Sequence, residues 1–469
     1  MRHIVVLGGG ITGLSCAARL LEGFRVTLLE KRPTTGGLAA SFRYRDFILD
    51  LGPHKLYSQL PGIMPLYSEI LQGKVLTVKK TNSLHLFGKN FSFPLQPIQF
   101  LRDFPKKPLV EIGAGFAAAR VRSLLGRKRP ESYEEYFIAG FGLSGYHYVF
   151  HDICQKIWGD PRTISSEMAV RRVPVPSLTH LLQTMVDRKK KEQASAASFC
   201  YPSEGGVGTV CDSLRAEIEG KGVEVLTNAT PLHIRTMGKR YEVTFQQSGG
   251  GRKRTRRIPA DIVISTIHLK DFLGLFAEVP SVVKEAADAL HYRSLLLCYF
   301  ILNAPSALKD TWVYFPEKRF MFSRVSEMVK FGSHTCPPGK TALMVEVPCE
   351  HDGELYHLPR ETLRERILAD LDTAGIPVRE TMLDFFTIKI NRMYPVYDRE
   401  YRTHLATVLD WVDNLPGVYT IGRQGLFNYS NTDHSLDMAQ RCAAHILAGR
   451  NQGDWSKERE YFDTYRIVD

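Results

Sequence analysis

The chain has 469 residues, of which 44% are hydrophobic and 24% are charged, so it is long enough for two or three domains and ordinary for a globular protein. Its net charge is +11, but no nucleic-acid-binding motif accompanies the basic residues, and no run of about 18 apolar residues is present to span a membrane. The eight cysteines are scattered without a CxxC pair, so we expect neither structural disulfides nor a metal site. We expect a cytoplasmic protein, because the first predicted strand begins at residue 3 and leaves no room for a targeting segment.

The chain begins with the pattern of a parallel βαβ unit. Two apolar runs flank a glycine-rich turn and a helix, with expected bounds of His3 to Leu7, Ile11 to Glu22 and Arg25 to Leu29. The turn has the G-x-G-x-x-G spacing, formed by Gly8, Gly10 and Gly13. These glycines permit, in order, a tight turn, a close approach of the backbone to a pyrophosphate, and close helix–strand packing. Glu30, about 20 residues further on, can accept hydrogen bonds from ribose hydroxyls, so the pattern predicts a dinucleotide site.

A second glycine pair follows the acidic residue, in the stretch EKRPTTGGLAASF. This stretch resembles the E-x-R-x-x-x-GG extension of the FAD-binding amine oxidase superfamily. The resemblance implies FAD rather than NAD as the cofactor. It also implies that this part of the chain contributes cofactor-binding residues, namely Glu30, Lys31, Arg32, Gly36, Gly37 and Leu38.

The middle of the chain returns to the same pattern. A helix from Gly208 to Glu219, a strand from Val223 to Leu226 and a buried strand over 260–269 are expected, and Pro231 lies in the turn between them. In the superfamily the corresponding elements lie beside the adenine and pyrophosphate, so Pro231 is a further cofactor-binding candidate. We therefore expect a discontinuous FAD domain, with other segments inserted. The expected ranges are 1–60, 200–275 and 415–450 for the FAD domain, 61–199 for a helical substrate subdomain, 276–414 for a substrate-binding sheet domain and 451–469 for a C-terminal tail.

Near the C-terminus, GVYTIGR is typical of a strand and turn, and NTDHSLDMAQRCAAHIL is typical of a helix. Asp433 or Ser435 is expected to cap this helix. A helix N-terminus at the cofactor can stabilise negative charge on the flavin or its pyrophosphate, and a plain capped helix packed on the sheet is the alternative. The cofactor-binding candidates here are Gly422, Arg423, Asp433 and Ser435.

In motif order the chain is most similar to the UDP-galactopyranose mutase-like branch of the amine oxidase and protoporphyrinogen oxidase-like superfamily. The similar segments are DLGPHKLYS (50–58), CQKIWGDP (154–161), RRVPVP (171–176), LHYRSLLL (290–297) and MYPVYD (393–398). The resemblance implies an α/β fold. It would contain a Rossmann-type FAD domain of the GR2 type, a mixed-sheet substrate domain and a helical subdomain.

The chain departs from the mutase pattern at four positions. Pro176 replaces an arginine that faces the sugar diphosphate in that branch, and Tyr57 replaces the second histidine of the flavin loop. Phe427 and Ser430 replace tyrosines of the C-terminal motif. A diphosphate needs several convergent donors, so these changes favour a different substrate. We expect an FAD-dependent oxidoreductase that removes a hydride from a C–N or C–C bond of an organic, lipophilic or anionic small molecule. A mutase-like enzyme without net redox change and a flavin-bound scaffold without turnover are the alternatives.

Six residues are candidates for the substrate side of the site: His54, Arg293, Tyr394 and Tyr429 for catalysis, and Trp158 and Arg172 for substrate binding. Each has a structural alternative, as a core side chain or a surface ion pair. The basic segment 101–130 has two interpretations as well. A helix from Leu109 to Leu125 either covers the cavity or contacts a membrane peripherally with its apolar face and basic end. The sequence predicts no oligomeric state and no nucleic-acid partner.

Overall fold

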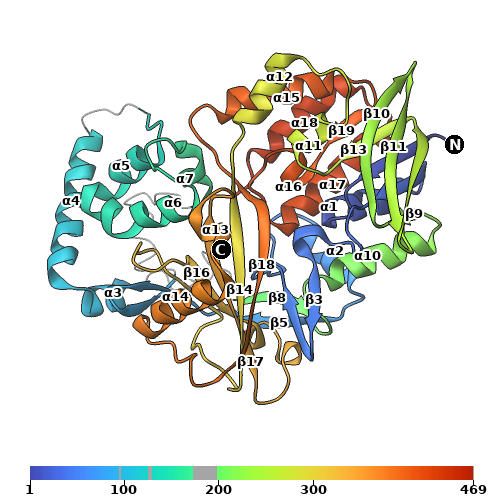
Figure 1. Cartoon of the computed structure of the whole chain (residues 1–469). Helices are drawn as coiled ribbons and strands as arrows, with labels where there is room; N and C mark the ends of the chain where they lie inside the picture. The colour runs from blue at the N-terminus through green and yellow to red at the C-terminus, as the bar shows by residue number, and fades with distance from the viewer. Residues whose placement is uncertain (94–96, 125–128, 173–197, 468–469) are drawn as a thin grey trace.

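The computed structural model describes residues 1–93, 97–124, 129–172 and 198–467. Figure 1 shows three regions: a layer of helices at one end, long central strands, and at the other end a smaller sheet covered by helices. The fold is mixed α/β, as the sequence predicted, with one parallel and one mixed sheet.

The parallel sheet has five strands in the order β19 (Val418–Thr420), β13 (Ile262–Ser265), β1 (His3–Leu7), β2 (Arg25–Leu29) and β9 (Glu224–Leu226). Strands β1 and β2 have the predicted bounds, and all five come from the three ranges expected to form the FAD domain. Successive residues of β1 face opposite sides, so Ile4 and Val6 belong to one hydrophobic cluster and Val5 and Leu7 to another. The sheet is therefore buried on both faces, as parallel sheets usually are.

Helices cover one face of this sheet. They are α1 (Ile11–Leu20), α2 (Ile63–Ile70), α10 (Thr209–Gly220) and α17 (Thr432–Leu447). The other face packs against an antiparallel sheet and three helices. These are β10 (Ala229–Met237), β11 (Arg240–Gly249), β12 (Arg252–Ala260), α11 (Leu269–Leu273), α12 (Ser281–Ala289) and α15 (Tyr401–Asp413). Helix α1 ends at Leu20, two residues before the predicted end.

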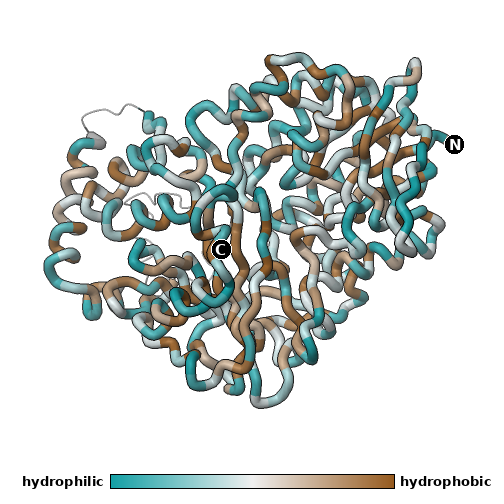
Figure 2. Tube along the Cα trace, viewed as in Figure 1, coloured by the Kyte–Doolittle hydropathy of each residue, from teal (hydrophilic) through white to brown (hydrophobic). Residues whose placement is uncertain are grey.

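The central sheet is mixed and has seven strands. Their order is β18 (Met382–Pro395), β14 (Tyr292–Leu302), β17 (Thr341–Cys349), β16 (Arg324–Glu327), β15 (Trp312–Tyr314), β6 (Asn82–Leu86) and β7 (Lys89–Ser92). Among the strand pairs of this sheet in the described part of the chain, only β15–β6 is parallel. Figure 2 shows the apolar character of the long central strands, and β14 is buried from Ser294 to Leu302. Strands β6 and β7 come from the range expected to form a helical subdomain, so that range also contributes to the sheet.

Smaller elements complete this region. On one face of the sheet lie α13 (Glu354–His357) and α14 (Arg360–Thr373), and on the other lie β3 (Ser41–Tyr44) and β4 (Phe47–Asp50). Strands β5 (Val75–Lys79) and β8 (Ser198–Pro202) form an antiparallel pair. The residues expected as a C-terminal tail instead contain α18 (Trp455–Phe462), and Trp455 is completely buried.

The helical layer contains α3 (Pro97–Asp103), α4 (Lys106–Leu124), α5 (Tyr133–Gly145), a π-helical turn (Tyr146–His151), α6 (Asp152–Ile157) and α7 (Ser166–Arg172). Helices α4 and α5 approach closely at two glycines. A Cβ on Gly142, whose φ is +78°, would lie 2.3 Å from the carbonyl carbon of Gly115. Among the described residues, no helix is long and apolar enough to cross a membrane.

Candidate functional site

A cavity of about 640 Å³ lies between the carboxyl edge of the parallel sheet and the end of the mixed sheet. The residues that follow β1, β2 and β13 line it on one side, and residues of β16, β17 and β18 line it on the other. Parallel α/β sheets bind ligands beyond the carboxyl ends of their strands, because the loops and helix N-termini converge there. The cavity is therefore in the position expected for a dinucleotide and its substrate.

The glycine-rich turn after β1 lines the cavity on the side of the parallel sheet. A Cβ on Gly13 would lie 2.0 Å from the Gly8 carbonyl oxygen, so the helix packs against the turn as closely as the sequence predicted. A Cβ on Gly10 would meet nothing closer than the Gly37 Cα at 4.0 Å. Gly10 thus faces open space, which is the geometry that a bound pyrophosphate requires. The Gly36 amide donates to the Gly9 carbonyl at 2.7 Å and holds the second glycine pair against the first.

The buried carboxylate of Glu30 is fixed by two backbone amides. It accepts from Gly9 N at 2.7 Å and from Arg32 N at 2.8 Å. Its remaining lone pairs are available to ribose hydroxyls. Helix α1 has neither a side-chain cap nor an acidic residue in its first turn, so its N-terminal amides can receive an anion. The open cradle, the oriented carboxylate and the uncapped helix together fit a dinucleotide.

Helix α17 approaches the same cavity, but its N-terminal cap differs from the prediction. Helix α17 begins at Thr432, and Asn431 caps it in a reciprocal arrangement with His434. The cap expected at Asp433 or Ser435 is therefore wrong, because the helix starts earlier than either residue. The carboxylate of Asp433 accepts from Ser58 Oγ at 2.8 Å and does not line the large cavity, whereas Ser435 does line it.

Gly422 and Arg423 connect this motif to the rest of the site. Gly422 has a φ of +82°, and a Cβ there would lie 2.8 Å from Thr12 Oγ1, so the backbone reaches the start of α1. The Arg423 guanidinium donates to the Ser430 carbonyl at 2.5 Å and to the Met393 carbonyl at 3.0 Å. Both acceptors are uncharged backbone carbonyls rather than carboxylates.

Two tyrosines and an arginine that the sequence predicted for the substrate side lie together in the cavity wall. The rings of Tyr394 and Tyr429 are stacked, with centroids 5.6 Å apart. Arg172, the last residue of α7, donates to Tyr429 Oη at 3.1 Å and lies over the Trp158 ring at 5.3 Å. Trp158 is buried and does not line the cavity. Its ring packs against the Arg172 guanidinium, so Trp158 would affect a substrate only through the position of Arg172.

This wall also contains an ion pair that was not predicted from the sequence. Arg324 on β16 donates to both carboxylate oxygens of Glu346 on β17, with one N–O distance of 3.0 Å. Tyr394 Oη lies 3.5 Å from Glu346 Oε1. Glu346 is buried in an otherwise apolar strand, and such a charge must be paired. A lone glutamate inside the run ALMVEVPC was the signal that could have revealed it.

His54 follows the Gly52-Pro53 turn and lines the cavity. Burial first, and then the positive charges of Arg324 and Arg423, lower the pKa of its imidazole to about 4, although a hydrogen bond with the Gly52 backbone offsets part of the effect. Its Nδ1 has no hydrogen-bond partner within the described residues. His54 is thus a neutral imidazole that can exchange a hydrogen bond with a ligand.

A second missed group lies near Lys31, and it contains His268, Asp271 and Arg392. Arg392 donates to the two carboxylate oxygens of Asp271 at 2.8 and 2.7 Å. Burial, followed by the charge of Arg392, lowers the pKa of His268 to about 3. This histidine is also neutral at physiological pH.

Arg293 does not occupy the position expected of a catalytic residue. It is absent from the cavity lining, pairs with Glu350 and donates to the Lys156 carbonyl at 3.2 Å. Its place on β14 directs the side chain toward α6, so the structure gives it a role in attaching the helical layer.

The predicted residues thus divide into two groups. Those that line the cavity are Gly8, Gly10, Glu30, Lys31, Arg32, Gly36, Gly37, Leu38, His54, Arg172, Pro231, Tyr394, Arg423, Tyr429 and Ser435. Those that do not are Gly13, Trp158, Arg293, Gly422 and Asp433. Helix α4, one interpretation of which was a cover for the cavity, contributes no described residue to the lining.

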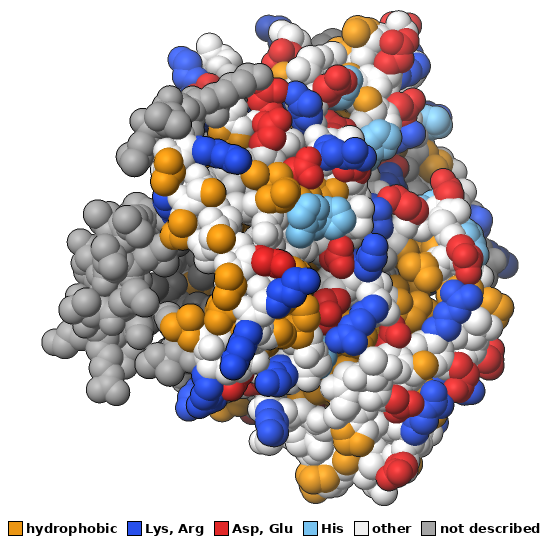
Figure 3. All heavy atoms as spheres, turned by 90° about the vertical axis from the view of Figure 1, so that its left-hand side faces the viewer, with side chains coloured by type: hydrophobic (Ala, Val, Ile, Leu, Met, Phe, Trp, Pro, Cys, Tyr) orange, Lys and Arg blue, Asp and Glu red, His pale blue; other side chains and the backbone are white. Residues whose placement is uncertain are grey.

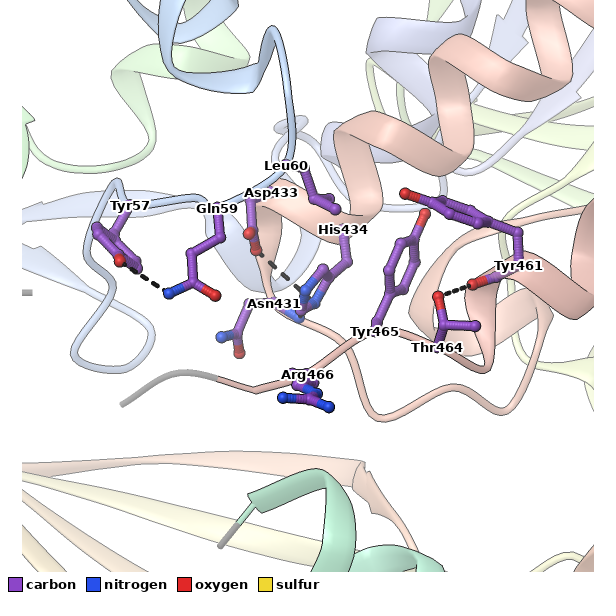
Figure 4. Close-up of a pocket in the computed structure, with 10 residues that line it drawn as sticks. All are labelled: Tyr57, Gln59, Leu60, Asn431, Asp433, His434, Tyr461, Thr464, Tyr465 and Arg466. Atoms are coloured by element: carbon purple, nitrogen blue, oxygen red, sulfur yellow. Dashed lines mark hydrogen bonds and ion pairs between the residues drawn. The ribbon is translucent and has the colours of Figure 1, made fainter. Parts of the chain in front are cut away.

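A smaller pocket of about 250 Å³ adjoins the cavity (Figure 4). It lies between the 57–60 loop, the start of α17 and residues 461–466, and Tyr57 and Asn431 line both spaces. The Tyr465 ring stacks on His434 with centroids 4.4 Å apart, and Gln59 Nε2 donates to Tyr57 Oη at 3.3 Å. These lining side chains therefore already contact one another.

Comparison with known proteins agrees with this geometry. The family model for flavin-containing amine oxidoreductases matches residues 11–447. The chain belongs to this family. Its cofactor is FAD, and the resemblance and fold class predicted from the sequence are confirmed.

Individual relatives are distant. The chain is 20% identical to coproporphyrinogen III oxidase of Staphylococcus aureus over 402 residues, which is 78% of this chain and 84% of the relative. Among solved structures, reduced UDP-galactopyranose mutase superposes with a TM-score of 0.81 at 21% identity, covering 96% of this chain and 94% of that one. A protoporphyrinogen oxidase-like protein from Exiguobacterium sp. 255-15 gives 0.73 at 17% identity, covering 96% and 99%. These two structural likenesses establish the fold alone.

Proposed function

We propose that this family member is an FAD-dependent oxidoreductase that removes a hydride from a C–N or C–C bond of an anionic organic substrate. FAD, when bound, supplies the hydride acceptor. The glycine cradle and Glu30 would hold the cofactor, and the substrate would bind against the wall formed by Arg172, Tyr394 and Tyr429.

The charge of the cavity carries this proposal. Among the described residues that line it, eight are Lys or Arg and three are Asp or Glu. A cofactor pyrophosphate neutralises part of this excess, and the rest favours a substrate with carboxylate or phosphate groups.

The three carboxylates are already engaged. Glu30 accepts from backbone amides, while Asp271 and Glu346 pair with Arg392 and Arg324. Recognition of a cationic amine requires an available acceptor with negative charge. Asp271 and Glu346 are each paired with an arginine, and the remaining lone pairs of Glu30 would accept from the cofactor ribose. The cavity therefore favours an anionic substrate over a cationic amine, although the family carries the amine name.

The side chains suggest a division of roles. Arg172 presents a guanidinium whose plane is supported by Trp158 and Tyr429, which suits bidentate binding of a carboxylate. Tyr394 and Tyr429 provide hydroxyls and flat apolar surface. Neutral His54 can donate or accept one hydrogen bond without adding charge, so it would orient the substrate beside the cofactor.

A mutase-like reaction on a nucleotide sugar is the second candidate, favoured by the arginine–tyrosine wall, which would also suit a diphosphate. Two observations weaken it. Phe427 is buried against Tyr292 and offers no hydroxyl, and Ser430 Oγ lies 3.5 Å from the Asn428 carbonyl of its own turn. Pro176, another of the departures, lies outside the described residues.

The test is anaerobic mixing of the purified FAD-loaded protein with four compounds, followed by the visible flavin absorbance. The compounds are coproporphyrinogen III, which carries propionate groups, its tetramethyl ester, a diamine and UDP-galactopyranose. We expect rapid bleaching with the carboxylated donor, slow bleaching with its ester and none with the diamine. Bleaching by the diamine, or conversion of UDP-galactopyranose by the reduced protein, would overturn the proposal.

A further inference from the structure

The outer face of helix α4 is apolar, which is unusual for a surface helix. Its exposed positions, at helical spacing, are Val110, Gly113, Ala114, Ala117, Ala118 and Val121. Val110 is 70% exposed and Val121 is 60% exposed, and neighbouring Leu101 of α3 is 63% exposed. A helix on the surface of a globular protein normally carries charged or polar residues at such positions.

The opposite face of α4 is already packed. It rests on α5, where Gly115 meets the backbone of Gly142, and Phe116 lies under the guanidinium of Arg120. The only acidic residue of the helix, Glu111, accepts from Tyr148 Oη at 2.6 Å on this inner side. The exposed face therefore remains apolar, with no carboxylate of α4 directed to it.

Cations lie at both ends of this face. Lys106 and Lys107 are exposed at the first turn of α4, and Arg122 is exposed at the last. Figure 3, which turns this side of the molecule toward the viewer, shows hydrophobic side chains gathered beside Lys and Arg. An apolar stripe with basic ends is the arrangement of helices that lie in the headgroup region of a bilayer.

We propose that the outer face of α4 is a peripheral docking site for a bilayer that contains anionic lipids. The valines and Leu101 would enter the boundary between headgroups and acyl chains, while Lys106, Lys107 and Arg122 would contact lipid phosphates. Small apolar residues provide little buried area, so the basic residues supply much of the affinity. Binding should therefore depend on anionic lipid and weaken with salt.

Charge also decides against a second copy of this chain as the occupant. Two α4 helices packed antiparallel would place Arg122 of one copy beside the two lysines of the other, and parallel packing would bring like ends together. Either arrangement juxtaposes cations without a carboxylate between them, which is unfavourable. An anionic surface neutralises the same residues.

The experiment is co-sedimentation of the full-length, FAD-loaded protein with phosphatidylcholine vesicles that contain or lack phosphatidylglycerol. The face variants are Val121→Glu and the double change Lys106→Glu/Lys107→Glu. The matched controls are Val282→Glu and Lys284→Glu on α12, since Val282 is 59% exposed and Lys284 is also exposed. Melting temperature and FAD content verify that each variant is folded.

We expect binding only to the anionic vesicles, with a loss of about five-fold for each lysine removed and at least a similar loss for Val121→Glu. The α12 variants should bind like the wild type. Equal binding to both vesicle types, no binding to either, or equal losses in the α4 and α12 variants would overturn the proposal. A dimer in light scattering that Val121→Glu dissociates, without vesicle binding, would assign the face to a second copy instead. None of these readouts uses catalytic activity, so the result is independent of the proposed reaction.

Discussion

Arg324 on β16 and Glu346 on β17 are direct register partners in the mixed sheet, and their side chains pair in the wall of the cavity. The pair removes a carboxylate from the list of groups that a cationic substrate could use. Burial is the main cause of the lowered pKa of His54, and the positive charge of Arg324 is the next largest cause. One cross-strand contact therefore influences both the substrate class and the protonation state of a neighbouring residue.

Replacement of Glu346 by Gln should destabilise the protein by about 3 kcal/mol, because Arg324 would be left as a largely buried charge without its partner. Urea denaturation measures the change. Glu365→Gln is the matched control, since Glu365 pairs with Arg379 at a half-exposed site and its loss should cost under about 1 kcal/mol. Equal losses of unfolding free energy in the two variants would show that burial of the Arg324–Glu346 pair does not add to its effect on stability.

Two glycines of the same motif should respond differently to alanine. In Gly10→Ala the new Cβ meets open space, so the melting temperature of the FAD-free protein should stay nearly unchanged while FAD binding weakens by at least about ten-fold through contact with the pyrophosphate. In Gly13→Ala the Cβ would lie 2.0 Å from a carbonyl oxygen, so the fold itself should be destabilised. Fluorescence titration with FAD and thermal melting separate the two effects. Normal FAD binding by Gly10→Ala would contradict a close approach of the pyrophosphate to Gly10.

The sequence predicted the parallel sheet and the close helix–strand packing at the glycines well, because both follow from local pattern: apolar runs of strand length and glycines at fixed spacing. It failed where side-chain direction or distant pairing decides. Arg293 was selected from a motif match, but a motif does not give the side of the strand on which a residue lies. Arg324 and Glu346 are 22 residues apart and meet only through strand register. The cap of α17 was missed because Asn431, Asp433 and Ser435 are all residue types that cap helices.

The pH dependence of stability should reveal Asp50, which is buried behind the cavity. Its carboxylate accepts from Ser41 Oγ at 2.5 Å, Tyr201 Oη at 2.6 Å and Val207 N at 3.1 Å. Burial outweighs these bonds and raises its pKa from 3.8 to about 6. Between about pH 6 and pH 4 the folded protein therefore holds a proton on Asp50 that the unfolded chain has lost. The contribution of Asp50 to stability should increase as pH falls through this range.

The measurement compares wild type with Asp50→Asn. Relative to the variant, the wild type should gain roughly 3 kcal/mol between about pH 6 and pH 4, at about 1.4 kcal/mol per pKa unit, and the difference should be constant above that range. Denaturant unfolding at several pH values gives the difference directly, and the variant cancels the effects of other carboxylates. A wild-type advantage that grows as pH rises would have the wrong sign.

The pH profile of turnover should show no titration of His54 in the neutral range. With a pKa near 4, its imidazole stays neutral above about pH 5, so kcat/KM should have no inflection near 6.5 that disappears in His54→Asn. The variant should lower kcat/KM at all pH values by a similar factor, because it loses an orienting hydrogen bond rather than a proton donor. An inflection near 6.5 that the variant removes would show that His54 is charged in the working enzyme.

Under the proposed function, reduction of the bound flavin depends on negative charge in the substrate. Stopped-flow measurement of the anaerobic loss of flavin absorbance tests this dependence, with the carboxylated donor and its ester compared in the wild type and in Arg172→Met. We predict rapid bleaching by the carboxylated donor in the wild type, a higher donor concentration for half-maximal rate in the variant by about ten-fold or more, and slow bleaching by the ester in both. Equal rates with the charged and esterified donors in the wild type would contradict the account.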